Sequence, residues 1–465
     1  MFEKITVPGL SDDENATANR LLKQLDDKTP GNVVRQSYYE LKRAVRQVGS
    51  IVPSHYYGMG LTLGWNAKGV DGLRNRCNLR GFAWADGDLD SLGLAEFVDD
   101  NRLMSEIPQG QTSSLIHGPA FLVNTIGMDD EPASLLHVRS ALVATGDYNW
   151  RTRKMDSLIS VTDTGDRGQV VEFTLYLPGE TISCRKDGLW RVVARQEHSY
   201  GVPVEILRYR PRDGRQYGTS RITPATMSLQ DAAVRALIRM EGHMDTYSWP
   251  EMWLLGADMS VFKNADGSLK TPMQVMLGRI KGIPDDDDAP NPRAEVKQFP
   301  ASSPKPHLEQ LNSLSKLVAR EFFLPDSSFS MTDYANPTSP DAYVEGRDDL
   351  IADAEVAMDE WSVSIRRAVR RGLAMQNRDG ALFNELRSLD ALWRSPLHLS
   401  RAAEADAGMK TVTAIPWLAE TEVGMELLGL SDDQIRRALA ERRRAVGTSR
   451  VLDRLRAVDA GDAEV

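Results

Sequence analysis

The chain has 465 residues, of which 41% are hydrophobic and 26% are charged, so it is long enough for about three domains and has the composition of a folded protein. Its formal net charge of −10 argues against a protein that grips nucleic acid by its phosphates. Cys77 and Cys184 lack the spacing of a disulfide framework or a zinc site. There is neither a signal-peptide pattern nor a long apolar run, which predicts a soluble protein made in a reducing cytoplasm.

The first half of the chain divides into a helical part and a β part. Residues up to about Lys28 are predicted to form an acidic, partly helical tail, and helical patches broken by glycines follow over 37–82. A helical segment near 92–104 is expected to lead into a short strand within Ile116–Val123. Over Leu135–Tyr209 apolar and polar residues alternate between turn signals, which predicts an antiparallel β region.

Two helices of similar length are expected to bracket a small β-rich insert. Ser228 and Asp231 form a capping-box pattern, which predicts a helix that begins there and ends before Pro250. Short apolar runs over 252–306 predict the insert, which also contains a run of acids. A second helix is predicted from His307 because its apolar residues recur three and four positions apart.

A polar loop and a very long helix follow. The loop, Leu324–Thr338, is rich in Ser, Thr, Asn and Pro, which favours a solvent-exposed connection. Ser339 and Pro340 suit the start of a helix that continues to about Asn377, roughly 35 residues or 50 Å, a length typical of ring-shaped assemblies. Arginines crowd its end and acids its first half, which suits the helix dipole. These acids are Glu345, Asp348, Asp349, Asp353, Glu355, Asp359 and Glu360. Residues from Trp393 onward are predicted to be helical.

Catalytic and metal-binding patterns are missing from the sequence. No phosphate-binding loop, dinucleotide fingerprint, HExxH or GxSxG motif occurs, and the histidines lack metal-ligand spacing. His117, inside an apolar run, is interpreted as a core histidine with satisfied hydrogen bonds. These observations predict a protein that is not an enzyme and holds no metal or cofactor. Two alternatives stay open: a soluble hydrolase or nuclease that uses carboxylates, and a scaffold or adaptor without a channel.

Several short motifs follow one another in an informative order along the chain. They are Asn78–Phe82, Tyr217–Ile222, Leu324-Pro325, Ser339–Ala342 and Trp393–Pro396. In this order they resemble the portal proteins of tailed bacteriophages, the siphophage type in particular. In that family the first motif forms a strand at the end of a helix, and the second precedes the first stem helix. The next two flank a channel loop, and the last lies in the helical end. The resemblance covers most of the chain.

The resemblance implies an α+β portal fold. Its parts are, in order, a β-rich wing, two stem helices around a small β-containing clip, a long helix that spans the wing, and a helical crown. The implied regions are a mixed α/β wing over 1–226, a first stem helix over 227–251, a clip over 252–305, a second stem helix over 306–322, a channel loop over 323–338, a long helix returning to the wing over 339–377, and a helical wing or crown region over 378–465.

The resemblance also implies which residues perform the function. Those expected to face DNA from the channel loop are Ser327, Ser328, Phe329, Ser330, Met331, Thr332, Asp333, Tyr334 and Asn336. Those expected in the stem are Met240, Met244, Leu311, Leu314 and Val318. Those expected to face a packaging motor or an adaptor from the clip are Asp285, Asp286, Asp287 and Asp288.

The implied assembly is a twelve-subunit ring at one vertex of the capsid in the virion, put together in the host cytoplasm. Its implied partners are double-stranded DNA that passes through the channel without sequence specificity, the large terminase, the major capsid protein and scaffold, and a head–tail adaptor, with no membrane. The negative charge of the chain suits such a conduit, because an acidic wall repels phosphates and keeps DNA from sticking.

Overall fold

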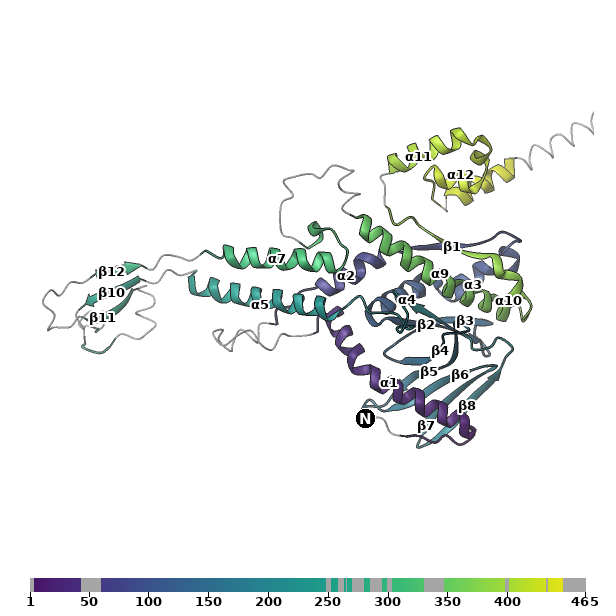
Figure 1. The fold of residues 1–465 in the computed structure, drawn as a ribbon, viewed down its shortest axis with the longest axis horizontal. Helices are drawn as coiled ribbons and strands as arrows, with labels where there is room; N and C mark the ends of the chain where they lie inside the picture. Colours follow the sequence, from purple (N-terminus) through teal and green to yellow (C-terminus); the bar gives the residue numbers. More distant parts are fainter. Residues whose placement is uncertain are drawn as a thin grey trace, which may run out of the picture. The chain divides into compact units, whose positions relative to one another are not determined.

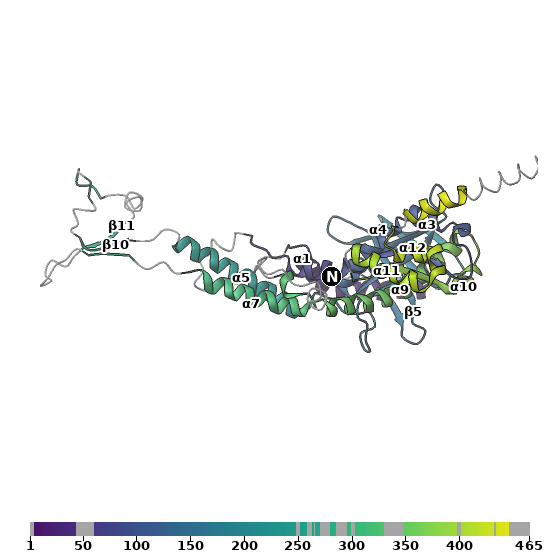
Figure 2. The same ribbon diagram turned by 90° about the horizontal axis from the view of Figure 1, so that it is seen from above.

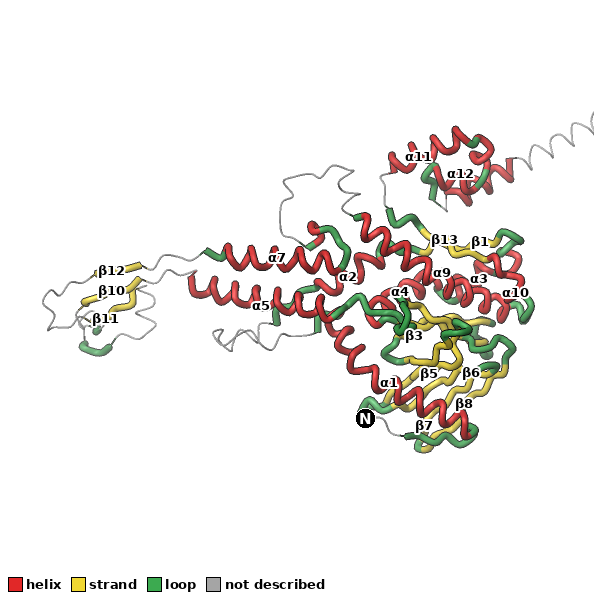
Figure 3. The backbone as a smooth tube through the Cα atoms, in the orientation of Figure 1, coloured by secondary structure: helices red, strands yellow, loops and turns green. Residues whose placement is uncertain are grey.

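The computed structural model describes residues 4–42, 60–247, 252–257, 263–264, 266–269, 280–284, 295–298, 303–329, 347–397, 401–431 and 434–445. The chain divides into two compact units, Met1–Pro396 and Leu397–Val465. Figure 1 labels the elements, and Figure 3 shows that helices and strands are both abundant. The predicted α+β class is therefore confirmed.

A five-stranded antiparallel sheet of the first unit confirms the predicted β region. Its strands run in the order β4-β5-β6-β7-β8. They are β4 (Ala144–Asn149), β5 (Lys154–Thr164), β6 (Val170–Leu177), β7 (Glu180–Asp187) and β8 (Leu189–Glu197). Alternate residues, such as Phe173, Leu175 and Ile182, are buried on one face, where they pack against Leu21 and Leu25 of α1. The sheet thus has one face covered by a helix.

The N-terminal helix is longer than the sequence predicted. α1 runs over Asp12–Tyr39 rather than ending near Lys28, and Pro30 lies inside it. A capping box starts it, because the Glu14 N–H donates to Ser11 Oγ at 3.3 Å and the Ser11 N–H donates to Glu14 Oε2 at 2.7 Å. The helix is not a tail, because burial of its apolar stripe against the five-stranded sheet stabilises it beyond what local propensity provides.

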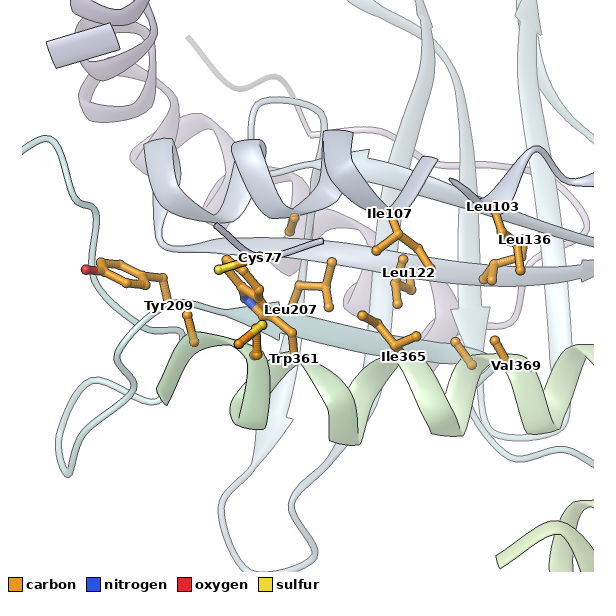
Figure 4. Packing of buried hydrophobic residues seen from close by; sticks show 14 of the residues in the cluster. Cys77, Leu103, Ile107, Leu122, Leu136, Leu207, Tyr209, Trp361, Ile365 and Val369 are labelled. Atoms are coloured by element: carbon orange, nitrogen blue, oxygen red, sulfur yellow. The ribbon is translucent and has the colours of Figure 1, made fainter. Parts of the chain in front are cut away.

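A three-stranded sheet, in the order β3-β2-β9, lies between two helices. Its strands are β2 (Pro119–Ile126), β3 (Ser134–Ser140) and β9 (Val204–Arg208). α4 (Leu103–His117) packs on one face and α9 (Asp348–Gln376) on the other. Figure 4 shows Leu122 and Leu207 between Ile107 of α4 and Ile365 of α9. The predicted strand at Ile116–Val123 therefore begins later, because α4 continues through His117 and ends at Gly118 with φ +104.

A strand pair joins distant parts of the first unit; the resemblance implied its first strand but not the pairing. β1 (Leu79–Trp84) pairs antiparallel with β13 (Leu389–Trp393). The short elements near this pair are η2 (Asp90–Leu92), α3 (Leu94–Asp100), α10 (Leu382–Glu385) and η5 (Leu386–Ser388). The region predicted as helical from 378 onward thus contains a strand, and the first compact unit extends to Pro396 because this strand has its partner there.

Two helices run side by side, as Figures 1 and 2 show: α5 (Pro224–Tyr247) and α7 (Lys305–Glu321). α2 (Trp65–Arg74) also packs against α5. Both predicted helices are confirmed, but the predicted start at Ser228 is wrong. Thr223 and Thr226 instead exchange hydrogen bonds between backbone N–H and hydroxyl at 3.0 and 3.3 Å, which starts α5 four residues earlier.

Short strands confirm the β content of the insert between these helices. β10 (Met252–Ala257) pairs in parallel with β11 (Ile280–Pro284) and antiparallel with β12 (Glu295–Gln298). An isolated antiparallel bridge joins Lys263 to Leu269. The acids Asp285, Asp286, Asp287 and Asp288 lie outside the described residues.

The long helix belongs to the first unit, and the second unit contains only helices among its described residues. α9 ends at Gln376, as predicted, whereas its predicted start at Ser339 lies outside the described residues. The second unit contains α11 (Arg401–Ala414), η6 (Pro416–Glu420), α12 (Glu422–Leu427) and a further helix over 434–445. Among the helices described here, none combines the length and the apolarity needed to cross a bilayer.

Candidate functional site at the base of the helix pair

A buried carboxylate on α9 is the centre of a polar network. Asp353 is 4% exposed, and it accepts hydrogen bonds from three side chains. The Tyr209 hydroxyl donates to its Oδ2 at 2.9 Å, and Arg210 Nε donates to its Oδ1 at 2.9 Å. Arg221 Nη1 also donates to Oδ2. Because charged hydrogen bonds are strong, this set of donors offsets the loss of water around the buried carboxylate.

Arg221 extends the network to two further elements. Its guanidinium is 3% exposed in the ion pair with Asp353. Nε donates to the Gly69 carbonyl of α2 at 2.8 Å, and Nη2 donates to the carbonyl of Phe322, directly after α7. Since Arg221 lies three residues before α5, one guanidinium connects the start of α5, the end of α7, α2 and α9. We call Tyr209, Arg210, Arg221 and Asp353 the base network.

Two neighbouring groups of this region stay protonated. Burial raises the pKa of Tyr209 to about 12, so its hydroxyl remains available to donate to Asp353. Burial also raises the pKa of the Cys77 thiol to about 12, with a further contribution from Asp353. Cys77 is therefore an inert core thiol rather than a nucleophile.

Apolar rings pack beside the base network. Phe322 is fully buried, and its ring stacks on Phe329 with centroids 6.3 Å apart. Trp65 meets Phe329 edge-on at 6.1 Å. A Cβ at Gly69 would lie 2.5 Å from the Phe322 ring, so α2 can approach this closely only with glycine there. The end of α7 is thus held by packing as well as by Arg221.

Further ion pairs hold α9 against the three-stranded sheet. Arg371 Nη2 donates to Glu205 of β9 at 2.6 Å, and both side chains are buried. Arg208 Nε donates to Glu360 at 2.8 Å. Because Asp353, Glu360 and Arg371 are spaced by seven and eleven residues, they lie on one side of the helix. α9 is therefore fixed along most of its length.

Three of the predicted channel-loop residues lie in the described part of the chain. Ser327 is exposed and Ser328 is half-buried. Phe329 is 8% exposed, between the rings of Trp65 and Phe322, which contradicts its predicted position at a DNA-facing surface. The ring is buried because an aromatic side chain gains more from leaving water than from facing it. Those outside the described residues are Ser330, Met331, Thr332, Asp333, Tyr334 and Asn336.

The predicted stem residues fall into two groups. Val318 is fully buried and Leu311 is 7% exposed, and both belong with Leu314 to the apolar cluster of the helix pair. Met240 is half-buried, and Met244 is 45% exposed. Leu311, Leu314 and Val318 of α7 therefore find their partners within the same chain, whereas the end of α5 leaves apolar surface uncovered.

His117 is a core residue, as predicted, but it is not fully satisfied. It is 5% exposed, and within the described residues its Nδ1 has no hydrogen-bond partner. The interpretation that its hydrogen bonds are satisfied is therefore wrong for Nδ1. Across the described ranges, no group of three or more His, Cys, Asp or Glu side chains could hold a metal ion.

His117 predicts a loss of stability in mild acid. Burial, and secondarily Arg35, lowers its pKa from 6.5 to about 4, so between these values the unfolded chain binds a proton that the folded chain does not. The stability it contributes is complete above pH 6.5 and is lost as the pH falls toward 4, by up to about 1.4 kcal/mol per pH unit. We expect urea unfolding of His117→Asn to show a shallower pH dependence than wild type over this range. An unchanged slope would rule this contribution out.

The sequence did not predict that Arg221 and Asp353 are partners. Asp353 was counted among the acids that suit the helix dipole, and Arg221 was only part of a motif. A usable signal was present, because Asp353 lies three residues after Leu350 and four before Ala357, in the apolar stripe of α9. A charged residue in such a stripe indicates a buried partner.

The sequence profile of a family described as "Phage portal protein, SPP1 Gp6-like" matches residues 20–448. The chain belongs to this phage portal protein family. A protein called portal protein from Mycobacterium phage L5 is 26% identical over 420 residues, covering 87% of this chain and 84% of that protein. The portal protein of Mycobacterium phage D29 is 26% identical over 421 residues, covering 88% and 83%.

Solved structures with a similar chain include parts of gene transfer agent (GTA) particles. One is a chain from the neck of the native GTA particle computed with C12 symmetry, with a TM-score of 0.41, 16% identity, and coverage of 79% of this chain and 90% of that one. Another is a chain from the virion of the native particle, with a TM-score of 0.40, 13% identity, and coverage of 87% and 99%. The family match confirms the prediction of a phage portal protein, and hence of a virion protein. This is a family of structural proteins.

Proposed function

We propose that this portal family member forms a closed ring of twelve identical copies at one capsid vertex, through which double-stranded DNA enters and leaves without sequence-specific binding. The observation that carries the proposal is the family match, because residues 20–448 include both helices of the pair, the insert, the loop and α9. In this proposal the chain performs no catalysis, and a separate motor drives the DNA.

Uncovered apolar side chains on the helix pair favour association between copies. Met244 and Tyr247 of α5 are 45% and 41% exposed, and Leu308 and Leu317 of α7 are 36% and 48% exposed. Apolar surface gathered on one pair of helices commonly marks a protein interface. A neighbouring copy would cover it, and the net charge of −10 on each chain would keep DNA from sticking to the wall of the resulting channel.

The regions of the chain take their roles from this ring. In the proposal, α5 and α7 are stem helices, the insert over 252–305 is the clip, and residues 330–338 belong to the channel loop. The large terminase and the head–tail adaptor would dock at the clip, where the acids of 285–288 lie. The capsid protein and scaffold would contact the wing and crown. A scaffold or adaptor without a channel is the second candidate, and it needs no closed ring.

One experiment with two readouts tests both the ring and the loop. We expect mass photometry and negative-stain microscopy of the purified chain to show rings with a central hole. Deletion of Ser330–Asn336, which keeps Phe329 in the core, should leave the rings intact but reduce DNA packaging or retention in assembled particles, because the channel loses its DNA-facing loop. A variant with a Gly-Ser segment of equal length at 330–336 is the control for loop length.

A stable monomer at all concentrations, without rings, would contradict the ring. Normal packaging by the deletion variant, with rings present, would contradict the channel role of the loop alone. The two results are separable, because ring formation is measured before any DNA is added.

A further inference from the structure

A strongly basic cleft lies beside the base network. Its volume is about 380 Å³, and Thr219, Ser220 and Thr223 are among its lining residues. Its charged lining residues are Arg35, Arg210, Arg212, Arg215, Arg221 and Glu321. The net charge of the whole chain is −10, so five arginines around one cavity give this part of the surface the opposite, positive charge. We call this cavity the arginine cleft.

The arginines of the cleft differ in their partners. Arg210 and Arg221 form ion pairs with Asp353. Arg35, Arg212 and Arg215 make no ion pair with any carboxylate among the described residues. Arg35 Nη1 instead donates to Asn32 Oδ1 at 3.1 Å and to the His117 carbonyl at 3.4 Å.

Nearby acids do not neutralise the positive charge of Arg35, Arg212 and Arg215. Asp213 accepts a hydrogen bond from the Gly214 N–H, within its own turn, and Glu321 is a single exposed carboxylate. Burial, and after it the charge of Arg215, lowers the pKa of Arg35, so two like charges are held close together. Arg35 is half-buried, whereas Arg212 and Arg215 are exposed. Like charges that line one cavity repel each other, and a bound anion would relieve this repulsion.

The backbone around the cleft is held in an unusual conformation. Arg210 and Phe323 both have left-handed φ values, +44 and +52, which non-glycine residues rarely adopt. The Arg210 guanidinium lies 4.6 Å from the centre of the Phe323 ring. The turn that carries Arg212 and Arg215 is closed by the Arg215 N–H donating to the Arg212 carbonyl at 2.8 Å. Strained backbone of this kind is found where a site must be held in one shape.

We propose that the arginine cleft is a binding site for a phosphate group. Arg35, Arg212 and Arg215 would donate to it, while Arg210 and Arg221 stay on Asp353. A phosphate suits these donors better than a carboxylate, because its oxygens can accept from several planar guanidinium forks at once, whereas a carboxylate is satisfied by one fork. The cavity volume leaves room for a phosphate with part of an attached sugar.

The phosphate has two possible sources with the same chemistry: free phosphate or the phosphodiester backbone of DNA. Binding of free phosphate does not depend on the proposed ring. Binding of the DNA backbone rests on the proposed function, since it requires DNA to pass near the cleft. In that case the cleft would bind DNA locally, on a protein whose net negative charge otherwise repels it. Added salt would weaken this binding.

The test compares wild type with Arg212→Ala/Arg215→Ala. The control is Arg151→Ala/Arg167→Ala, which removes the same charge from two exposed arginines outside the cleft. Isothermal titration with inorganic phosphate measures the first source, and fluorescence anisotropy with a labelled short duplex, at low and physiological salt, measures the second. Mass photometry of each variant reports assembly independently of either ligand.

We expect wild type and the control to bind phosphate and the cleft variant to bind it at least about tenfold more weakly, since charged hydrogen bonds are lost. Competition between the duplex and phosphate would support the DNA backbone as the source, whereas phosphate binding without competition would support free phosphate. Equal phosphate affinity of wild type and the cleft variant would overturn the proposal. So would a cleft variant that loses only assembly, because an acidic group of a second copy would then be the occupant.

Discussion

Asp353→Ala is expected to lower the free energy of unfolding by about 3–5 kcal/mol, because it breaks a buried ion pair. The reason is that Arg221, buried beside it, would lose its counter-charge while it remains tied to the carbonyls of Gly69 and Phe322. Urea unfolding at neutral pH, followed by circular dichroism, measures the change. Asp359→Ala removes an exposed acid from the same helix and should cost within about 0.5 kcal/mol.

A second comparison separates charge from hydrogen bonding in this network. Arg221→Met/Asp353→Leu removes both charges, but it leaves the carbonyls of Gly69 and Phe322 without their donor. Buried acceptors without donors are costly, so the double variant should remain clearly less stable than wild type. If Asp353→Ala cost no more than Asp359→Ala, the network would not hold the helices together.

Phe322→Ala should cost about 3–5 kcal/mol, because it removes a fully buried ring and leaves a cavity between α2 and the end of α7. The next residue is a natural control, since Phe323 is 37% exposed. Phe323→Ala should cost about 1.5 kcal/mol or less, because most of what it loses is partial burial and the contact with Arg210.

The comparison of the two phenylalanine variants also tests how the helix pair is anchored. Hydrogen exchange of α5 and α7 should quicken in Phe322→Ala more than in Phe323→Ala, since the end of α7 loses its packing against Trp65 and Phe329. Similar unfolding free energies for the two variants would show that the ring cluster does not anchor the pair.

Local patterns in the sequence predicted much of the fold. The alternation of apolar residues predicted the antiparallel sheet, and the helical spacing after His307 predicted α7. The end of α9 was also predicted. These features share one property: each is defined by residues that are close together in the sequence, within one helix or one strand. The stem, clip and channel roles of the chain stay predictions.

What the sequence missed depends on contacts between distant residues. β13 looks too short and irregular to be a strand until β1 pairs with it. α1 continues past Pro30, where Tyr38 is buried in the core that α2 and α4 also line. In the candidate site, Arg221 and Asp353 are 132 positions apart, so neither residue indicates the other by spacing. Phe329 was placed at a surface because the polar residues around it hid its partner, Trp65.

The pairing of β1 with β13 has a consequence for synthesis on the ribosome. About 300 residues separate the partners, so at about 5–20 residues per second the edge of β1 waits on the order of 15–60 s for β13 to emerge. During that time its unpaired N–H and C=O groups are open to another nascent chain. A protein made in many copies at once would benefit from a chaperone that shields this edge until translation nears its end.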